Sequence, residues 1–285
     1  SCDVSMTYHK DKDELRCHYC GRVKAPGKLC PECNKPYLKY FGTGTQQVEE
    51  QVKKLFPHQK VLRMDVDTMS AKDSHTKLFE DFSAGKADIL LGTQMITKGF
   101  DFEGVQLSAI LAADTMLNFP DYRSAERTFE QITQVAGRAG RKSDGKVILQ
   151  TYNPEHYAVQ LAAKHDYEGF YAEEMKRRSS AQYPPLATFV QILFSGEKEE
   201  EVILAVKDFL KQLKQVLLPA KNDIISIHAA PSAIRRINDM QRYQILIHMK
   251  NVSGDGLIGE IYDLFSRIRY KNVLTGIDIN PENMA

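Results

Sequence analysis

The sequence predicts an α/β chain in three parts: a cysteine-bearing segment, a unit of alternating helices and strands, and a small α+β domain. Three observations predict this architecture. All five cysteines lie within the first 33 residues. Strand-length apolar runs then alternate with amphipathic helical patterns as far as residue 152. Beyond the Pro184-Pro185 break, the patterns follow the order β-α-β-β-α-β, which is typical of a ferredoxin-like plait.

Length and composition indicate a soluble protein of about two domains. The 285 residues are 42% hydrophobic and 26% charged, and 38 basic against 37 acidic residues give a net charge of +1. This balance excludes a strongly basic nucleic-acid coat, although a local basic groove is compatible with it. The longest apolar runs, 88–92 and 107–113, are too short to span a membrane, and no signal peptide opens the chain. We therefore expect a cytoplasmic protein.

Four cysteines form two Cys-x-x-Cys pairs, Cys17 with Cys20 and Cys30 with Cys33, separated by nine residues. Two such turns can present four thiolates to one tetrahedral zinc ion, and Gly21 after the first pair suits a tight turn. Disulfides are the alternative, but the absence of a secretory signal disfavours an oxidising compartment. The spacing therefore predicts zinc.

Cys2 is the fifth cysteine, and it has two interpretations. It is either a buried structural thiol or the second half of a further Cys-x-x-Cys pair whose first half precedes Ser1. The chain starts Ser-Cys-Asp without a methionine, which favours the second interpretation. We therefore expect the chain to begin inside a zinc module that is truncated here.

Residues 42–152 are predicted to form a parallel sheet covered by helices. The strands 88–92 and 106–113 are continuously apolar, as expected for strands that are buried on both faces. The helices are predicted over 45–56, 72–84 and 123–139, and the other strands over 60–65 and 146–151.

Loops that follow parallel strands are where such a sheet binds its ligands. The loop 93–101 offers polar side chains, a cation, a glycine at position 99 and a carboxylate at position 101. Each of these alone is a weak indication, because Gly-x-Asp turns are common.

The run Gln134-Val-Ala-Gly-Arg-Ala-Gly-Arg141 is more informative. Arg138 and Arg141 are three residues apart, so a helix would place them on one face with Gln134. Planar guanidinium groups in this arrangement suit a transferring phosphoryl group. A solvated arginine pair at a helix end is the alternative, but it would not explain the two glycines that separate the charges.

The C-terminal domain is predicted from local patterns. Two helices over 155–166 and 168–180 lead into strands 188–194, 223–228, 233–237, 243–248 and 273–279, with helices over 198–216 and 256–269. Its nearly balanced charge favours an interaction or packing domain. The predicted boundaries are 1–40 for the zinc-binding region, 41–153 for the α/β unit, 154–185 for a helical connector and 186–285 for the plait.

The loop 93–102 and the run 134–141 resemble motifs V and VI of superfamily 2 helicases. With the segments 63–68 and 121–127 and the cysteine-rich region, the whole chain resembles the C-terminal portion of PriA, the family of bacterial primosomal replication-restart helicases. The resemblance implies a RecA-like second helicase lobe between a zinc-ribbon stub and a C-terminal plait domain.

The resemblance also implies roles for individual residues. Arg138 and Arg141 would reach the γ-phosphate of ATP, with Arg141 as arginine finger and Gln134 positioning the phosphate or water. Gly99 and Asp101 would lie near the bound nucleotide, and Thr93 and Gln94 would contact the DNA backbone. The implied zinc ligands are the five cysteines, Cys2, Cys17, Cys20, Cys30 and Cys33. In the family, the ligands of two zinc ions are interleaved between four cysteine pairs, so one or both sites are expected to be incomplete in this chain.

The sequence contains no Gly-x-x-x-x-Gly-Lys-Ser/Thr phosphate loop and no Asp-Glu-x-His segment. We therefore expect ATP and Mg²⁺ to bind only in the full-length protein, and this part alone to be inactive. The implied function is that of an ATP-dependent 3′-5′ DNA helicase that recognises stalled forks. Its implied partners are single-stranded and forked DNA, single-stranded-DNA-binding protein and other primosome proteins, without a membrane. The alternative is a non-enzymatic zinc-ribbon scaffold that binds single-stranded DNA or proteins.

Overall fold

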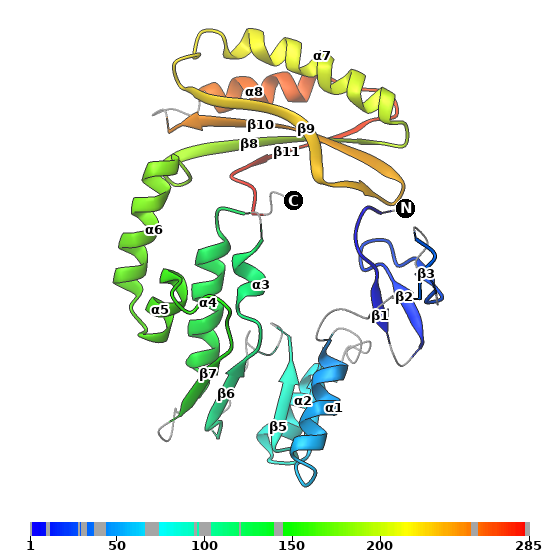
Figure 1. The fold of residues 1–285 in the computed structure, drawn as a ribbon. Helices are drawn as coiled ribbons and strands as arrows, with labels where there is room; N and C mark the ends of the chain where they lie inside the picture. The colour runs from blue at the N-terminus through cyan, green and yellow to red at the C-terminus, as the bar shows by residue number, and fades with distance from the viewer. Residues whose placement is uncertain are drawn as a thin grey trace. The chain divides into compact units, whose positions relative to one another are not determined.

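The structure, a computed structural model, describes residues 2–9, 12–27, 29, 33–36, 44–65, 74–93, 96, 104–119, 121–139, 145–251 and 256–282. The chain divides into two compact units (Figure 1). One unit comprises residues 1–36, 120–122 and 175–285, and the other comprises residues 37–119 and 123–174. None of the helices in the described ranges is both long enough and apolar enough to span a bilayer.

The cysteine-bearing segment forms a small antiparallel sheet in the order β1-β2-β3, with strands β1 (Thr7–His9), β2 (Glu14–Arg16) and β3 (Val23–Lys24). Thr7 of β1 pairs with Arg16 of β2. The residues that precede β1 and those that follow β2 therefore lie at the same end of the sheet.

The second unit alternates helices and strands, as predicted from periodicity. Its elements are α1 (Thr45–Leu55), β4 (Val61–Met64), α2 (Ser74–Ser83), β5 (Ile89–Gly92), β6 (Leu107–Ile110), α3 (Asp114–Leu117), α4 (Ser124–Ala136), β7 (Lys146–Leu149), α5 (Tyr157–Ala163) and the start of α6 (Tyr167–Ala181). Strand β4 pairs with β5, and β6 with β7, both in parallel. The short helix α3 is an addition to the predicted elements.

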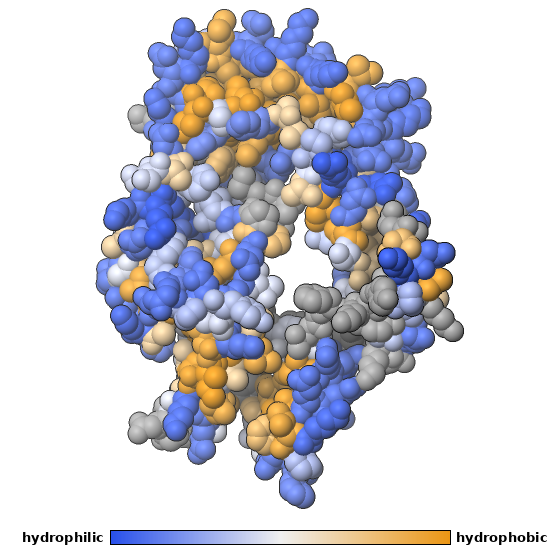
Figure 2. All heavy atoms as spheres, in the orientation of Figure 1, coloured by the Kyte–Doolittle hydropathy of each residue, from blue (hydrophilic) through white to orange (hydrophobic). Residues whose placement is uncertain are grey.

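The prediction of burial on both faces, made for the strand over 106–113, is wrong for β6, and the neighbouring strand β7 is also exposed. Leu107 of β6 is 55% exposed and Ile148 of β7 is 58% exposed. Figure 2 shows hydrophobic atoms at the surface over these two strands. In the described residues the strands form two separate pairs rather than one continuous sheet, so apolar side chains of β6 and β7 remain in contact with solvent.

Helix α4 is anchored by a core that it shares with α5 and α6. Phe129 stacks on Phe170 of α6 with ring centroids 4.2 Å apart, and Ile132 is 3% exposed. Ala158 and Ala162 of α5 are fully buried in the same cluster. Because one face of α4 is buried, the position of its C-terminal end is fixed relative to this core.

The C-terminal domain has the predicted β-α-β-β-α-β order, with one strand in place of the two expected over 223–228 and 233–237. Its elements are β8 (Ala187–Gly196), α7 (Glu199–Leu217), β9 (Ile224–Ile237), β10 (Met240–Lys250), α8 (Gly256–Arg267) and β11 (Leu274–Ile279). The sheet is antiparallel with the strand order β11-β8-β10-β9, and α7 and α8 cover one face (Figure 1). This is the arrangement of a ferredoxin-like plait.

The two strands predicted over 223–228 and 233–237 are one strand, β9. The pairing of β9 with β10 is interrupted by a bulge, where residues 232–235 of β9 lie opposite Arg242 alone. Bulges of this kind break the period-two pattern of a strand without ending it, which explains why the sequence pattern divided β9 in two.

Aromatic side chains cover part of the sheet face that points away from the helices. Phe189 of β8 lies 4.4 Å from His248 of β10 between ring centroids, 5.8 Å from Tyr183 and 5.9 Å from Tyr122. The guanidinium of Arg178 lies 5.3 Å from the centre of the Tyr122 ring. Tyr122 therefore packs on the C-terminal domain.

We expect Phe209→Ala to destabilise the C-terminal domain by about 3–5 kcal/mol. Phe209 of α7 is 1% exposed, and its ring meets Phe194 of β8 edge-on with centroids 5.7 Å apart. The matched control is Leu204→Ala on the same helix, which should cost about 0.5 kcal/mol or less because Leu204 is 66% exposed. Urea unfolding followed by circular dichroism measures both, and equal losses in the two variants would contradict this packing.

Candidate functional site

The turn after β2 presents two of the cysteines. Cys17 follows β2 directly, and its carbonyl accepts a hydrogen bond of 2.8 Å from the N–H of Gly21. The N–H of Cys17 donates to the carbonyl of Arg22 at 3.0 Å. Gly21 has a φ of +70°, a conformation that glycine adopts at little cost. The tight turn predicted for this Cys-x-x-Cys pair is therefore present.

The thiols of Cys2, Cys17 and Cys20 converge, with their sulfur atoms within 4.8 Å of one another. The pairing of β1 with β2 brings them together, because Cys2 precedes β1 and Cys17 follows β2. The expectation that Cys17 and Cys20 share one ion with the second Cys-x-x-Cys pair is not what the structure shows. Cys33 is exposed and outside this group, and Cys30 lies outside the described residues.

Three converging thiols have the donor chemistry of a zinc site. Among the described residues this cluster offers three ligands, so a tetrahedral ion would take a fourth from elsewhere. The Asn238 N–H lowers the pKa of Cys2, but desolvation and hydrogen bonding with the Cys20 and Cys17 thiols outweigh it and raise that pKa above its usual value. A metal ion must therefore displace protons from the cluster, and its binding weakens as the pH falls.

Helix α4 ends one turn earlier than predicted. It stops at Ala136, and the N–H of Arg138 donates to the carbonyl of Val135 at 3.1 Å in the tighter turn that follows. Gln134 is exposed on the last turn of α4. Arg138 lies beyond the end of the helix, so the two residues do not share one helical face. Arg138 is partly buried.

Thr93 is exposed and follows β5 directly. Gly92 precedes it, and a Cβ at that position would overlap the carbonyl oxygen of Met64 and the side chain of Ile96. Glycine is therefore required where β5 meets the end of β4. The other predicted nucleotide and DNA residues lie outside the described residues: Gln94, Gly99, Asp101 and Arg141.

A charged network ties α1 to the end of β4. The Nη1 of Arg63 donates to Oε2 of Glu49 at 3.0 Å, and its Nε lies 3.0 Å from Oδ2 of Asp65. The hydroxyl of Thr45 donates to the same Asp65 oxygen at 2.5 Å. Asp65 and Arg63 fall within the segment that contributed to the helicase resemblance, and both are largely buried. The network fixes Asp65, the first residue after β4, beside the start of α1.

Asp114 is a buried acid that the sequence analysis missed. It opens α3, and its carboxylate accepts hydrogen bonds from the Thr151 hydroxyl at 2.7 Å, the Tyr152 N–H at 2.7 Å and the Asn153 N–H at 3.2 Å. The hydrogen bond from Thr151, together with the two backbone donors, lowers the pKa of Asp114 below its usual value. Asp114 thereby joins the loops that follow β6 and β7. An acid that follows an apolar strand was the available signal in the sequence.

We expect Asp114→Asn to destabilise the α/β unit by about 1.5–3 kcal/mol at neutral pH, because it removes hydrogen bonds to a charged group. The lowered pKa means that the ionised carboxylate stabilises the fold above about pH 4, the unfolded value, and that this contribution disappears as the pH falls through the folded value. The wild type should therefore lose stability on acidification more steeply than Asp114→Asn. Denaturant titrations at several pH values measure the free energy of unfolding, and Asp263→Asn is the control because Asp263 is exposed. If the stability of wild type and of Asp114→Asn changed in parallel with pH, this prediction would be contradicted.

Three polar side chains of β9 and β10 make contacts within the chain. Arg236 donates to Oδ1 of Asp3 at 3.0 Å, and Arg242 donates to the carbonyl of Ile234 at 3.2 Å. The hydroxyl of Tyr243 donates to Glu199 at 2.6 Å. Arg235, which precedes Arg236 on β9, has an exposed side chain.

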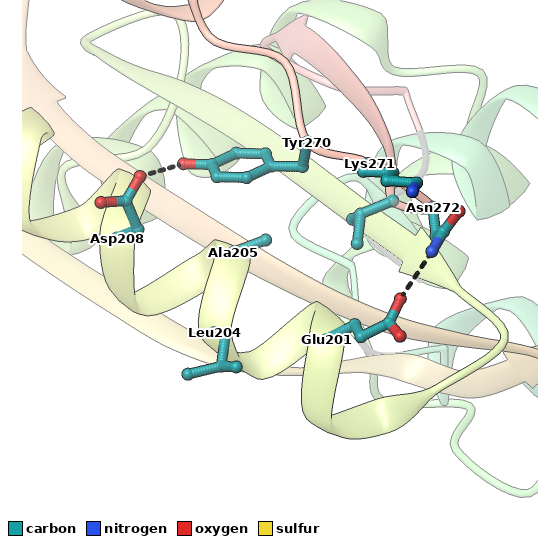
Figure 3. Close-up of a pocket in the computed structure, with 8 residues that line it drawn as sticks. Glu201, Leu204, Ala205, Asp208, Tyr270, Lys271 and Asn272 are labelled. Carbon is teal, nitrogen blue, oxygen red and sulfur yellow. Dashed lines mark hydrogen bonds between the residues drawn. The ribbon is translucent and has the colours of Figure 1, made fainter.

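A pocket of about 440 Å³ lies beside α7 (Figure 3). The Tyr270 hydroxyl donates to Asp208 at 2.8 Å, and burial and this carboxylate raise the pKa of Tyr270, so it stays protonated. Asn272 donates to Glu201 at 3.2 Å. These polar groups satisfy one another, and the pocket contains none of the predicted site residues. Its lining comprises Glu201, Leu204, Ala205, Asp208, Tyr270, Lys271, Asn272 and Val273.

Three protein-family models match successive parts of the chain. The family model of the PriA DNA helicase Cys-rich region matches residues 1–24, that of the helicase conserved C-terminal domain matches residues 36–143, and that of the primosomal protein N C-terminal domain matches residues 179–282. Together with the fold, these matches define a helicase C-terminal domain that carries a cysteine-rich region before it and a further domain after it.

The relatives to which this chain is similar include several replication restart proteins named PriA. The chain is 46% identical to that of Bacillus subtilis over 99% of its own length and 35% of the relative. It is 43% identical to the protein of Synechocystis, over 87% of this chain and 30% of the relative. It is 36% identical to the protein of Chlamydia muridarum, over 98% of this chain and 37% of the relative. The chain belongs to the PriA family and corresponds to its C-terminal portion. It spans about a third of the length of the curated relatives that it matches.

Proposed function

We propose that this chain is the C-terminal part of an ATP-dependent 3′-5′ DNA helicase that recognises stalled replication forks and directs primosome assembly. The run from Gln134 to Arg141 carries the proposal, because it begins on the last turn of α4 and continues past the end of that helix within a helicase C-terminal domain. The packed face of α4 gives this run a fixed starting point, as a charge that acts on a transferring phosphoryl group requires.

In this proposal the chain supplies one side of a nucleotide site. Arg141 is the arginine finger, Arg138 a second cation toward the γ-phosphate, and Gln134 positions the phosphate or the attacking water. Gly99 and Asp101 lie beside the nucleotide. ATP and Mg²⁺ are bound mainly by a phosphate-loop lobe, whose motif is absent from these 285 residues. Closure of the two lobes on ATP, and reopening after hydrolysis, moves single-stranded DNA past Thr93 and Gln94.

The flanking modules take recognition roles. Zinc, when bound by Cys2, Cys17 and Cys20, supplies a structural crosslink for a segment with three short strands. A second zinc ion would take Cys30 and Cys33. The C-terminal domain contacts branched DNA, single-stranded-DNA-binding protein and other primosome proteins. A helicase of this kind acts on the chromosome, so its location is the bacterial cytoplasm.

A non-enzymatic scaffold is the second candidate. The absence of a phosphate loop from the 285 residues is the observation that favours it. The paired arginines of the run 134–141 oppose it, because a scaffold that only binds DNA has no need of an arginine finger.

A strand-displacement assay distinguishes the two candidates. The full-length protein should unwind a duplex with a 3′ single-stranded tail when ATP and Mg²⁺ are present, and a duplex with a 5′ tail much less. The 285-residue chain alone should show no DNA-stimulated ATP hydrolysis. Binding of forked DNA by the full-length protein without unwinding or ATP hydrolysis would overturn the helicase in favour of the scaffold.

A further inference from the structure

The turn between β9 and β10 lies against the cysteine-rich segment, near the N-terminus of the chain (Figure 1). Two residues, Asn238 and Asp239, connect the strands, with φ values of +53° and +64°. Positive φ at both central residues defines a type I′ turn, the tight connection that matches the twist of a hairpin. Asparagine and aspartate adopt this conformation more readily than most residues, so the turn has a defined geometry.

Two pairs of charged residues hold the turn beside the cysteine cluster. Asp3 donates its N–H to the carbonyl of Arg236 at 2.9 Å, and Arg236 returns a hydrogen bond to the Asp3 carboxylate at 3.0 Å. Arg22 lies 3.6 Å from the carboxylate of Asp239. Asp3 follows Cys2, and Arg22 lies two residues after Cys20. These contacts therefore flank two of the three converging thiols.

Between these pairs, the main-chain N–H of Asn238 points at the sulfur of Cys2, with 3.3 Å between N and Sγ. In a two-residue hairpin turn, the ladder pairs the residues on either side, here Ile237 and Met240. The N–H of the first turn residue is directed away from that ladder. The hairpin therefore leaves this donor available, and Cys2 accepts from it.

We propose that the β9–β10 turn is an outer-shell support of the metal centre, in which the Asn238 N–H donates a hydrogen bond to the Cys2 thiolate and slows the loss of the metal. Outer-shell donors orient a ligand and stabilise its charged form. Because the contact joins the cysteine cluster to the C-terminal domain, metal loading and docking of the hairpin support each other. Asn238 is a positioning residue that acts through its main chain. The inference rests on the metal assignment of the proposed function but not on helicase activity.

The direct test is nuclear magnetic resonance of the ¹⁵N-labelled chain loaded with ¹¹³Cd in place of zinc. A hydrogen bond from an amide to a metal-bound thiolate transmits scalar coupling between the amide proton and the cadmium nucleus. We expect such a coupling at the Asn238 amide, and slower hydrogen exchange of that amide with metal than without it. Cadmium bound by Cys2 without this coupling, and with unchanged exchange at Asn238, overturns the inference alone. A chain that binds no cadmium overturns the metal assignment as well.

Substitutions supply an independent readout, the rate at which a chelator removes zinc. We expect Arg236→Ala to raise this rate about tenfold or more, because outer-shell partners typically change metal affinity by 10- to 100-fold. Arg235→Ala is the matched control, since Arg235 is the exposed neighbour on the same strand. Asn238→Gly keeps both the N–H and the positive φ, so it should release zinc at about the wild-type rate. Equal release from Arg236→Ala and Arg235→Ala, or fast release from Asn238→Gly, would contradict a role for the main-chain donor.

Discussion

In the full-length protein, Arg141→Ala should lower DNA-stimulated ATP hydrolysis by about 10³-fold or more, the effect typical of arginine fingers. The guanidinium would stabilise charge that develops on the γ-phosphate in the transition state. Affinity for single-stranded DNA should persist, because the proposed DNA contacts are Thr93 and Gln94. Steady-state ATP hydrolysis with and without single-stranded DNA measures the effect.

Two control variants make this result specific. Arg141→Lys keeps the positive charge but loses the planar pair of donors, so it should recover little activity. Lys146→Ala removes an exposed cation at the start of β7 and should hydrolyse ATP at nearly the wild-type rate. Nearly normal hydrolysis by Arg141→Ala would remove Arg141 from the proposed site. Loss of single-strand binding in the same variant would instead indicate a disrupted fold.

The second large effect concerns the cysteine cluster. Cys17→Ser should release the metal and unfold the segment around β1–β3, because metal-binding free energy is folding free energy in such small modules. Cys33→Ser should leave the cluster loaded, since Cys33 is exposed and outside the converging group. Zinc analysis of protein purified without chelators measures loading, and alkylation with mass spectrometry measures protection of Cys2 and Cys20.

This experiment separates two arrangements of ligands. If Cys33→Ser exposes Cys2, Cys17 and Cys20 to alkylation, the second Cys-x-x-Cys pair shares their metal and the observed grouping is contradicted. If only Cys17→Ser does so, the three thiols form a site of their own. A wild-type chain that contains no metal would contradict metal binding by the cysteine cluster altogether.

Most secondary structure was predictable from the sequence, because it follows from local patterns. The period-two alternation of β8 and the apolar stripe of α7 each occur within one segment, and both were predicted within three residues at each end. The plait topology followed from the order of such segments. Where several residues interrupt a local pattern, prediction failed: the bulge opposite Arg242 made one strand look like two.

The sites depend on contacts between distant residues, which a single sequence does not encode locally. Cys2 meets Cys17 only because β1 pairs with β2, whereas the spacing rule favoured the nearer Cys-x-x-Cys pair. Asp114 is held by residues that are 37 to 39 positions away. The donor from Asn238 to Cys2 crosses 236 positions. By contrast, Gln134 and Arg138 were chosen as candidate site residues from one short run of sequence. The end of α4, at Ala136, was not predicted correctly from that run.

In the proposed function, this chain forms one side of an ATP site whose other side belongs to the same longer protein. Determining the coding sequence upstream of Ser1 tests it most directly. We expect an open reading frame that continues upstream and encodes a Gly-x-x-x-x-Gly-Lys-Ser/Thr phosphate loop followed by an Asp-Glu-x-His segment. An initiation codon directly before the codon for Ser1, preceded by an in-frame stop codon, would contradict it.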